Sequence, residues 1–78
     1  MNKREAYIIS DDLVRILVAE RNRKNIKYSR MAIELGMSKS SVSNIEKLTQ
    51  KPTLPTYLMI ANYLGLSLEE IVKRLNKK

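Results

Sequence analysis

The chain has 78 residues and a mass of 9.0 kDa, which is enough for one small domain and too little for two. It contains no Cys and no His, so disulfides, cysteine-based zinc sites, thiol nucleophiles and serine–histidine hydrolases are excluded. The formal net charge of +7 favours an anionic partner, nucleic acid first, although solubility alone would also account for it.

The first predicted helix begins at Ser10, which can cap backbone N–H groups and is followed by two Asp residues that suit the positive end of a helix dipole. Residues 1–9 are therefore expected to form an N-terminal arm. Apolar residues then recur at helical spacing. Asn25 can adopt the left-handed conformation that ends a helix.

The second and third helices are predicted over residues 28–35 and 39–47. Gly36 follows the first of these two, where a positive φ is needed, and Ser38 caps the second. The start of the earlier helix carries a weaker signal, because Lys27 stands where Ser, Thr or Asp would be the usual cap.

A fourth helix is predicted over residues 54–64, with Thr53 as its cap, Pro in its first turn and Gly65 after its end. Ser67 and Glu70 then fit a capping box in front of a last apolar stripe. These signals predict a fifth helix near the end of the chain.

The whole pattern predicts an all-α fold of five short helices, without strand alternation or internal repeats. The folded domain is expected to span residues 10–76, between the arm and a charged tail of residues 77–78. No apolar stretch approaches the ~20 residues of a membrane-spanning helix, and no signal peptide is visible. We therefore expect a cytoplasmic protein.

The stretch from Tyr28 to Ile45 meets the demands of a helix-turn-helix, in which two helices cross steeply through a short turn. Ala32 is small enough for a close approach, and Gly36 supplies the positive φ of the turn. Val42 and Ile45 can bury apolar groups against the preceding helix. The same spacing could also arise in any pair of short packed helices.

At these residues the chain resembles the phage-repressor and Cro helix-turn-helix family, the XRE-type regulators. The resemblance runs from about Leu13 to Ile71. It implies a compact, five-helix, lambda-repressor-like domain that binds operator DNA, usually as a dimer. It also implies that Arg21 pairs with Glu46 beneath the recognition helix, two solvated charges being the alternative.

Three positions depart from the family pattern. Tyr28 stands where the family usually has Gln, which commonly contacts phosphate and braces the recognition helix. Leu48 stands where the family usually has Gly, so helix 39–47 must end without a positive φ or continue further. Lys27 replaces the usual polar cap.

A recognition helix presents its first side chains to base edges in the major groove. In helix 39–47, Lys39 could donate to guanine and Asn44 could pair with adenine. The predicted base-contacting residues are Lys39, Ser40, Ser43 and Asn44. The predicted phosphate-contacting residues are Lys27, Tyr28, Arg30, Ser41, Lys47, Thr49, Gln50 and Lys51. For Ser40 and Ser41, capping is the alternative role.

One recognition helix covers only a few base pairs, so two copies are expected to bind half-sites about 34 Å apart. The candidate dimer contacts are apolar residues near the end of the chain, which could instead belong to the core. They are Tyr63, Leu66, Leu68, Val72 and Leu75.

We therefore expect a sequence-specific DNA-binding transcriptional regulator, most simply a homodimeric repressor on a palindromic operator, nucleoid-associated and encoded by a prokaryote, phage or plasmid. Its partners would be double-stranded DNA and a second copy, with no membrane, small-molecule ligand, cofactor or metal. Tyr28 and Leu48 keep open an antitoxin-like or antirepressor-like protein-binding module, and a nucleoid-type binder without sequence preference is a further alternative. An enzyme is not expected, because the acidic pairs Asp11-Asp12 and Glu69-Glu70 are adjacent and capping explains them.

Overall fold

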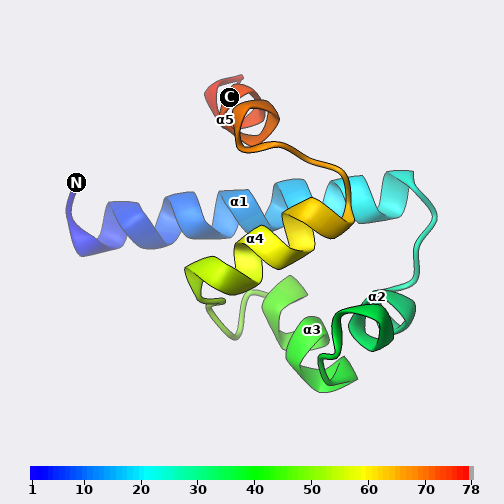
Figure 1. Cartoon of the computed structure of the whole chain (residues 1–78). Helices are drawn as coiled ribbons and strands as arrows, with labels where there is room; N and C mark the ends of the chain where they lie inside the picture. Colours follow the sequence, from blue (N-terminus) through cyan, green and yellow to red (C-terminus); the bar gives the residue numbers. More distant parts are fainter. Residues whose placement is uncertain (78) are drawn as a thin grey trace.

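The computed structural model describes residues 1–77, which contain five helices and no strand. Figure 1 shows the long first helix crossing the molecule, with α5 on one side and the pair α2 and α3 on the other. The predicted all-α, five-helix fold is confirmed. The helices are α1 (Lys3–Arg23), α2 (Tyr28–Leu35), α3 (Lys39–Glu46), α4 (Leu54–Tyr63) and α5 (Leu68–Asn76).

The prediction for the start of α1 was wrong. The helix begins at Lys3, because Asn2 and Glu5 form a reciprocal capping box: Asn2 Oδ1 accepts from the Glu5 N–H at 2.8 Å, and Glu5 Oε1 accepts from the Asn2 N–H at 3.3 Å. Ser10 lies inside the helix instead of capping it, and its hydroxyl is hydrogen-bonded to the Tyr57 hydroxyl on α4. Most of the predicted arm, residues 1–9, is therefore helical.

The other helix starts follow the predicted caps. Ser38, Thr53 and Ser67 each accept a hydrogen bond from the backbone N–H three residues later. Lys27 precedes α2 and provides no side-chain cap, because its ammonium group cannot accept a hydrogen bond from a backbone N–H. Helices α3 and α4 each end one residue before the predicted last residue, because the closing turns begin there.

Left-handed residues follow several helix ends. Asn25 has φ 57° and Gly36 has φ 70°, as predicted. Leu48 has φ 66°, so the expectation that it would avoid a positive φ was wrong. The turn is closed by hydrogen bonds from the Leu48 N–H to the Ile45 carbonyl and from the Thr49 N–H to the Asn44 carbonyl, each 3.0 Å. These bonds satisfy the last carbonyls of α3 and hold Leu48 in a conformation that glycine would adopt more easily.

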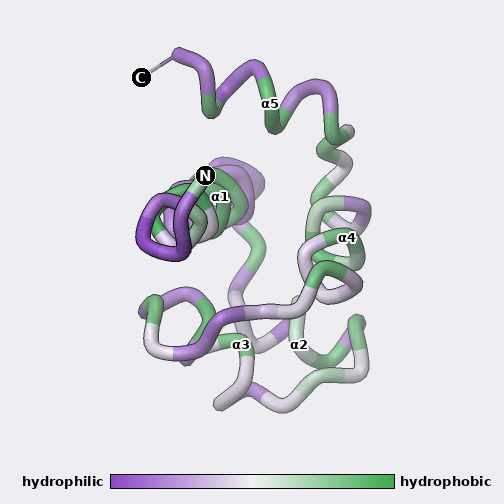
Figure 2. The backbone as a smooth tube through the Cα atoms, turned by 90° about the vertical axis from the view of Figure 1, so that its left-hand side faces the viewer, coloured by the Kyte–Doolittle hydropathy of each residue, from purple (hydrophilic) through white to green (hydrophobic). Residues whose placement is uncertain are grey.

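The core draws residues from all five helices and from the turn before α5. Figure 2, which views α1 nearly end-on, shows α4 beside it and α5 and α3 on opposite sides. Ala32, Val42 and Leu64 are completely buried, and Leu66 is only 8% exposed. Burial of apolar side chains at roughly 25 cal/mol per Å² is the main favourable term for so small a domain.

Candidate nucleic-acid interface

The α2–α3 pair has the close approach that a helix-turn-helix requires. Gly36 takes the left-handed conformation at the end of α2, and the Met37 N–H donates to the Ala32 carbonyl at 2.8 Å. Ala32 on α2 and Val42 on α3 are both 0% exposed and belong to the same core cluster. The two helices are therefore packed together through the core.

The outer face of α3 is polar and accessible. Lys39, Ser40 and Asn44 are exposed, and Ser43 is half-buried. Val42 and Ile45, on the opposite face, are buried against the rest of the domain. The structure therefore brings the four predicted base-contacting residues onto one face of one helix.

The serines at the start of α3 hydrogen-bond to one another. Ser38 Oγ accepts from the Ser41 N–H at 3.1 Å and donates to Ser41 Oγ at 2.8 Å. Ser40 Oγ lies 3.4 Å from Ser38 Oγ. Ser41 is half-buried in this network, which supports the capping role for it, whereas Ser40 keeps an exposed side chain.

Three predicted phosphate-contacting residues, Lys27, Tyr28 and Arg30, are exposed at the start of α2. Lys27 gives this helix no side-chain cap, and the N–H groups of Arg30 and Met31 donate to the Lys27 carbonyl at 3.1 Å each. Arg30 Nε donates to Glu34 Oε1 at 2.8 Å, and this hydrogen bond lowers the pKa of Glu34. A phosphate would have to compete with Glu34 for the Arg30 guanidinium.

The segment after α3 carries Lys47, Thr49, Gln50 and Lys51, all exposed. Thr49 Oγ1 donates to the Asn44 carbonyl at 3.1 Å, which helps to close the turn after α3. Lys51 is directed towards α1, where it forms an ion pair with Asp11 and lies 5.6 Å from the centre of the Tyr7 ring. Sequence reasoning missed both contacts, because it placed Tyr7 in an arm and treated Asp11 only as a residue suited to the start of a helix.

Arg21 connects α1 to the end of α3. Its Nε and Nη2 atoms donate to the two carboxylate oxygens of Glu46 at 2.6 Å each, and its Nη1 donates to the Ile26 carbonyl at 2.6 Å. One guanidinium therefore joins α1, the loop after it and the end of α3. The predicted pairing of Arg21 with Glu46 is present in the structure, and its side chains are only 11% and 17% exposed.

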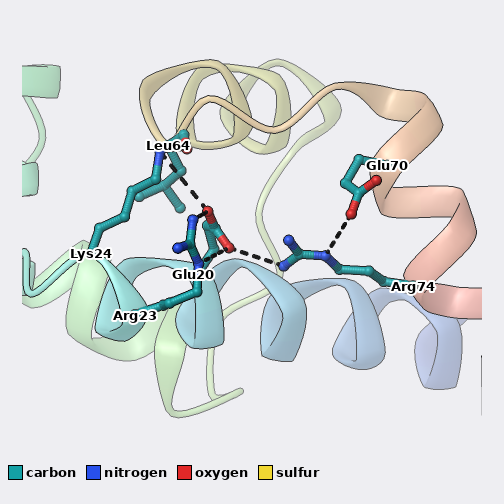
Figure 3. A network of polar contacts seen from close by, with 6 residues as sticks. All are labelled: Glu20, Arg23, Lys24, Leu64, Glu70 and Arg74. Atoms are coloured by element: carbon teal, nitrogen blue, oxygen red, sulfur yellow. Dashed lines mark hydrogen bonds and ion pairs between the residues drawn. The ribbon is translucent and has the colours of Figure 1, made fainter.

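A second ionic cluster, centred on Glu20, lies on the α5 side of α1 (Figure 3). Arg23 donates to its carboxylate at 2.6 and 3.0 Å, and Arg74 of α5 donates at 3.1 Å. The hydrogen bond from Arg23, supported by Arg74, outweighs burial and lowers the Glu20 pKa from 4.5 to about 2. Lys24 donates to the Leu64 carbonyl at the end of α4. The cluster joins α1, α4 and α5, and the sequence offered no signal for it beyond helical spacing.

The candidate dimer residues separate into two groups. Leu66 belongs to the core, and the half-buried Tyr63 and Leu75 pack against it. Leu66 is therefore removed as a surface candidate, because the turn before α5 directs its side chain inwards. Leu68 and Val72 on α5 are well exposed.

The described residues contain no helix long and apolar enough to cross a membrane. Within residues 1–77 there is also no group of three or more acidic side chains placed to hold a metal ion.

Comparison with known protein families gives a match to the helix-turn-helix family over residues 17–71. The matched segment begins inside α1 and ends inside α5, so it includes α2, α3 and α4 entirely. Comparison with curated proteins and with solved structures gives no significant match.

Proposed function

Because the chain belongs to the XRE-type helix-turn-helix family of DNA-binding regulators, we propose that it acts as a homodimeric repressor at a palindromic operator. In this proposal α3 enters the major groove, and the protein works on the DNA of a bacterial, phage or plasmid genome in the cytoplasm. The observation that carries the proposal is the accessible polar face of α3 on a firmly packed helix pair.

The chemistry of that face suits base recognition. Lys39 can donate to guanine O6 and N7, and the Asn44 amide can pair with adenine N6 and N7. Ser40 and Ser43 are short enough to let the helix approach the base edges closely. The Arg21–Glu46 contact keeps the far end of α3 in place while its first turns meet DNA.

Phosphate contacts would come from both sides of α3. The uncapped start of α2 offers backbone N–H groups together with Lys27 and Tyr28, an arrangement suited to an anion. On the other side, Lys47 and the segment at Thr49 and Gln50 are exposed. Such contacts position a protein on the duplex without reading its sequence.

The short length of α3 is the reason to propose a dimer. Eight residues make a helix about 12 Å long, which spans only a few base pairs. Two copies related by a two-fold axis would read two half-sites one helical turn apart and so reach useful specificity.

The experiment that tests the proposal is selection of genomic DNA fragments by the purified protein at near-physiological salt. The test variant is Lys39→Ala/Asn44→Ala. A matched control is Lys77→Ala/Asn76→Ala, which removes the same two residue types from exposed positions at the end of α5. We expect an enriched palindrome that is lost with the test variant and retained with the control.

Two other results would contradict the proposal in different ways. Enrichment that survives the Lys39→Ala/Asn44→Ala change would place base recognition outside α3. No enrichment by the folded wild-type protein would exclude an operator-binding regulator. If a palindrome is found, a reporter with that site over its promoter tests the direction: repression predicts lower output when the protein is present.

A further inference from the structure

A cluster of polar contacts joins the first half of α1 to the segment between α3 and α4, residues 47–53. Lys51 in this segment forms an ion pair with Asp11, and its ammonium group lies 5.6 Å from the centre of the Tyr7 ring. The Lys3 ammonium group lies 5.7 Å from the centre of the same ring. Both distances are within the roughly 6 Å of a cation–π contact. The segment lies on the same side of α1 as α3 (Figure 1).

Helical spacing places two basic residues on the same face of α1 as this cluster. Tyr7 and Asp11 both contact Lys51, so the face that they share is turned towards residues 47–53. Lys3 and Arg4 lie four and three positions before Tyr7, which puts them one turn away on that face. Both are exposed. The first turns of α1 therefore present two cations beside the segment that follows α3.

The carboxylates in this half of α1 are already engaged. Glu5 Oε1 accepts from the backbone N–H that begins the capping box, at 3.3 Å, and Asp11 is paired with Lys51. Asp12 accepts from an arginine one turn later at 3.0 Å. Within residues 1–77, Lys3 and Arg4 form no ion pair. Their charges are therefore available to an anion outside the chain.

The arrangement of these cations suits a polyanion better than a small ion. Lys47 and Lys51 are exposed on residues 47–53, and Lys3 and Arg4 continue the basic surface onto α1. A small-molecule site would need polar groups that converge in a concave pocket, whereas these side chains form a row on open surface. Double-stranded DNA carries one charge per ~1.7 Å of its axis and can meet such a row at several phosphates.

The first turns of α1 lie outside the segment that matches the helix-turn-helix family. The match covers residues 17–71, which include residues 47–53 but not residues 3–16. The contacts of Lys3 and Arg4 are therefore features of the present chain and not of the matched segment.

We propose that the first turns of α1 are an additional DNA-backbone contact, in which Lys3 and Arg4 bind phosphates next to those reached from residues 47–53. The Lys51 contacts with Asp11 and Tyr7 hold the two segments side by side. The inference rests on the proposed function, because it needs α3 and its flanks to face DNA. It assigns a role to a part of α1 that the recognition helix does not involve.

The test is fluorescence anisotropy with a labelled mixed-sequence DNA duplex over a range of salt concentrations. The test variant is Lys3→Ala/Arg4→Ala. We expect it to lower the slope of log K against log salt by about 1.8, since each phosphate contact contributes about 0.9. The matched control is Lys73→Ala/Lys77→Ala, which removes the same charge from exposed positions on α5 and should leave the slope unchanged.

The test variant should fold as well as the wild type. The capping box of Asn2 and Glu5 stays intact, and cations are removed from the positive end of a helix dipole. Circular dichroism checks this expectation.

Two outcomes would overturn this inference alone. One is an unchanged slope for Lys3→Ala/Arg4→Ala when Lys47→Ala lowers it. The other is an equal reduction by the α5 control, which would show that the charges act only as a general field. If the wild type does not bind the duplex even at low salt, the proposed function fails as well, so the two failures can be told apart.

A second measurement uses only the wild-type chain. In an NMR titration with the same duplex, amide signals of residues 3–12 should shift together with those of α3 and residues 47–53. The signals of α5 should stay in place. Shifts confined to α2, α3 and residues 47–53 would contradict a contact at the start of α1.

Discussion

Leu48, which follows α3, has a backbone conformation that its own Cβ disfavours, with φ 66°. A non-glycine residue in the left-handed region costs roughly 1–2 kcal/mol of stability. Glycine avoids this cost, but it loses about 0.5–1 kcal/mol because it has more conformational freedom in the unfolded chain. We therefore expect Leu48→Gly to be more stable than Leu48→Ala by about 0.5–1 kcal/mol, measured by urea unfolding.

The neighbouring residue supplies the control for this comparison. Lys47 has φ −81°, an ordinary conformation for any side chain. At that position Lys47→Ala should be more stable than Lys47→Gly, which is the usual order. If Leu48→Ala is also more stable than Leu48→Gly, the left-handed conformation at position 48 does not lower the stability of the domain.

Glu20 should give the domain a specific sensitivity to acid. Its pKa is lowered from 4.5 to about 2 by the hydrogen bond from Arg23, with Arg74 contributing. A carboxyl with a lowered pKa in the folded state contributes stability above its unfolded pKa, and this contribution is lost as the pH falls through the folded value. We expect Glu20→Gln to be less stable than wild type at neutral pH, with a difference that shrinks between about pH 4.5 and pH 2.

Urea unfolding at a series of pH values measures this difference directly. Glu69→Gln is the matched control, since Glu69 is an exposed carboxylate on α5. It should follow the wild-type curve closely across the same range. A difference between wild type and Glu20→Gln that stays constant down to pH 2 would exclude ionisation of Glu20 as its origin.

At the scale of the helices, the Arg21–Glu46 contact is the main polar link between α1 and the end of α3. Two hydrogen bonds of 2.6 Å in a largely buried setting should give the pair a coupling energy of about 1–2 kcal/mol in a double-mutant cycle with Arg21→Met and Glu46→Gln. The measurement is equilibrium unfolding of the wild type, the two single variants and the double variant.

The exposed pair Arg30–Glu34 within α2 serves as the reference for that cycle. Its side chains are 76% and 42% exposed, and pairs of this kind couple by only about 0.3–0.5 kcal/mol. Equal coupling in the two cycles would mean that the Arg21–Glu46 pair stabilises the packing of α3 no more than a surface pair does.

The ends of the helices were largely predictable, because capping is local. Ser38, Thr53 and Ser67 lie within one turn of the N–H groups that they accept from, so their role is visible in the sequence. The start of α1 was missed although its capping box, Asn2 with Glu5, is equally local. The serine and two aspartates at 10–12 provided a competing signal, but the helix runs through Ser10, whose hydroxyl is hydrogen-bonded to Tyr57 instead of capping.

At the scale of the whole molecule, the charge of +7 should appear as a steep salt dependence of DNA binding. Each phosphate contact that is removed lowers the slope of log K against log salt by about 0.9. We expect this reduction for Lys27→Ala and for Lys47→Ala, measured by fluorescence anisotropy with a duplex over a range of salt concentrations. Lys77→Ala, at the end of α5, should leave the slope unchanged.

If Lys77→Ala reduces the slope as much as the other two changes do, the charge acts as a general field and not through contacts beside α3. Lys51→Ala should have a smaller effect than Lys47→Ala, because Lys51 is already paired with Asp11. The difference between the two slopes measures how far the ion pair with Asp11 keeps Lys51 from contacting a phosphate.

The sequence alone determined the five-helix architecture, the turn at Gly36 and the polar face of α3. All of these depend on residues within a few positions of one another, through caps, helical periodicity and backbone preference. The Arg21–Glu46 pair also came from the sequence, through resemblance to a family rather than through physics.

Only the tertiary structure decided which side chains meet across long separations. Arg74 reaches Glu20 from 54 positions away, Lys51 reaches Asp11 from 40, and Leu66 turns inwards while Leu68 stays exposed. These outcomes depend on how α1, α4 and α5 pack, which no local pattern encodes. The same packing leaves an apolar groove between α1, α4 and α5, which no local pattern in the sequence locates.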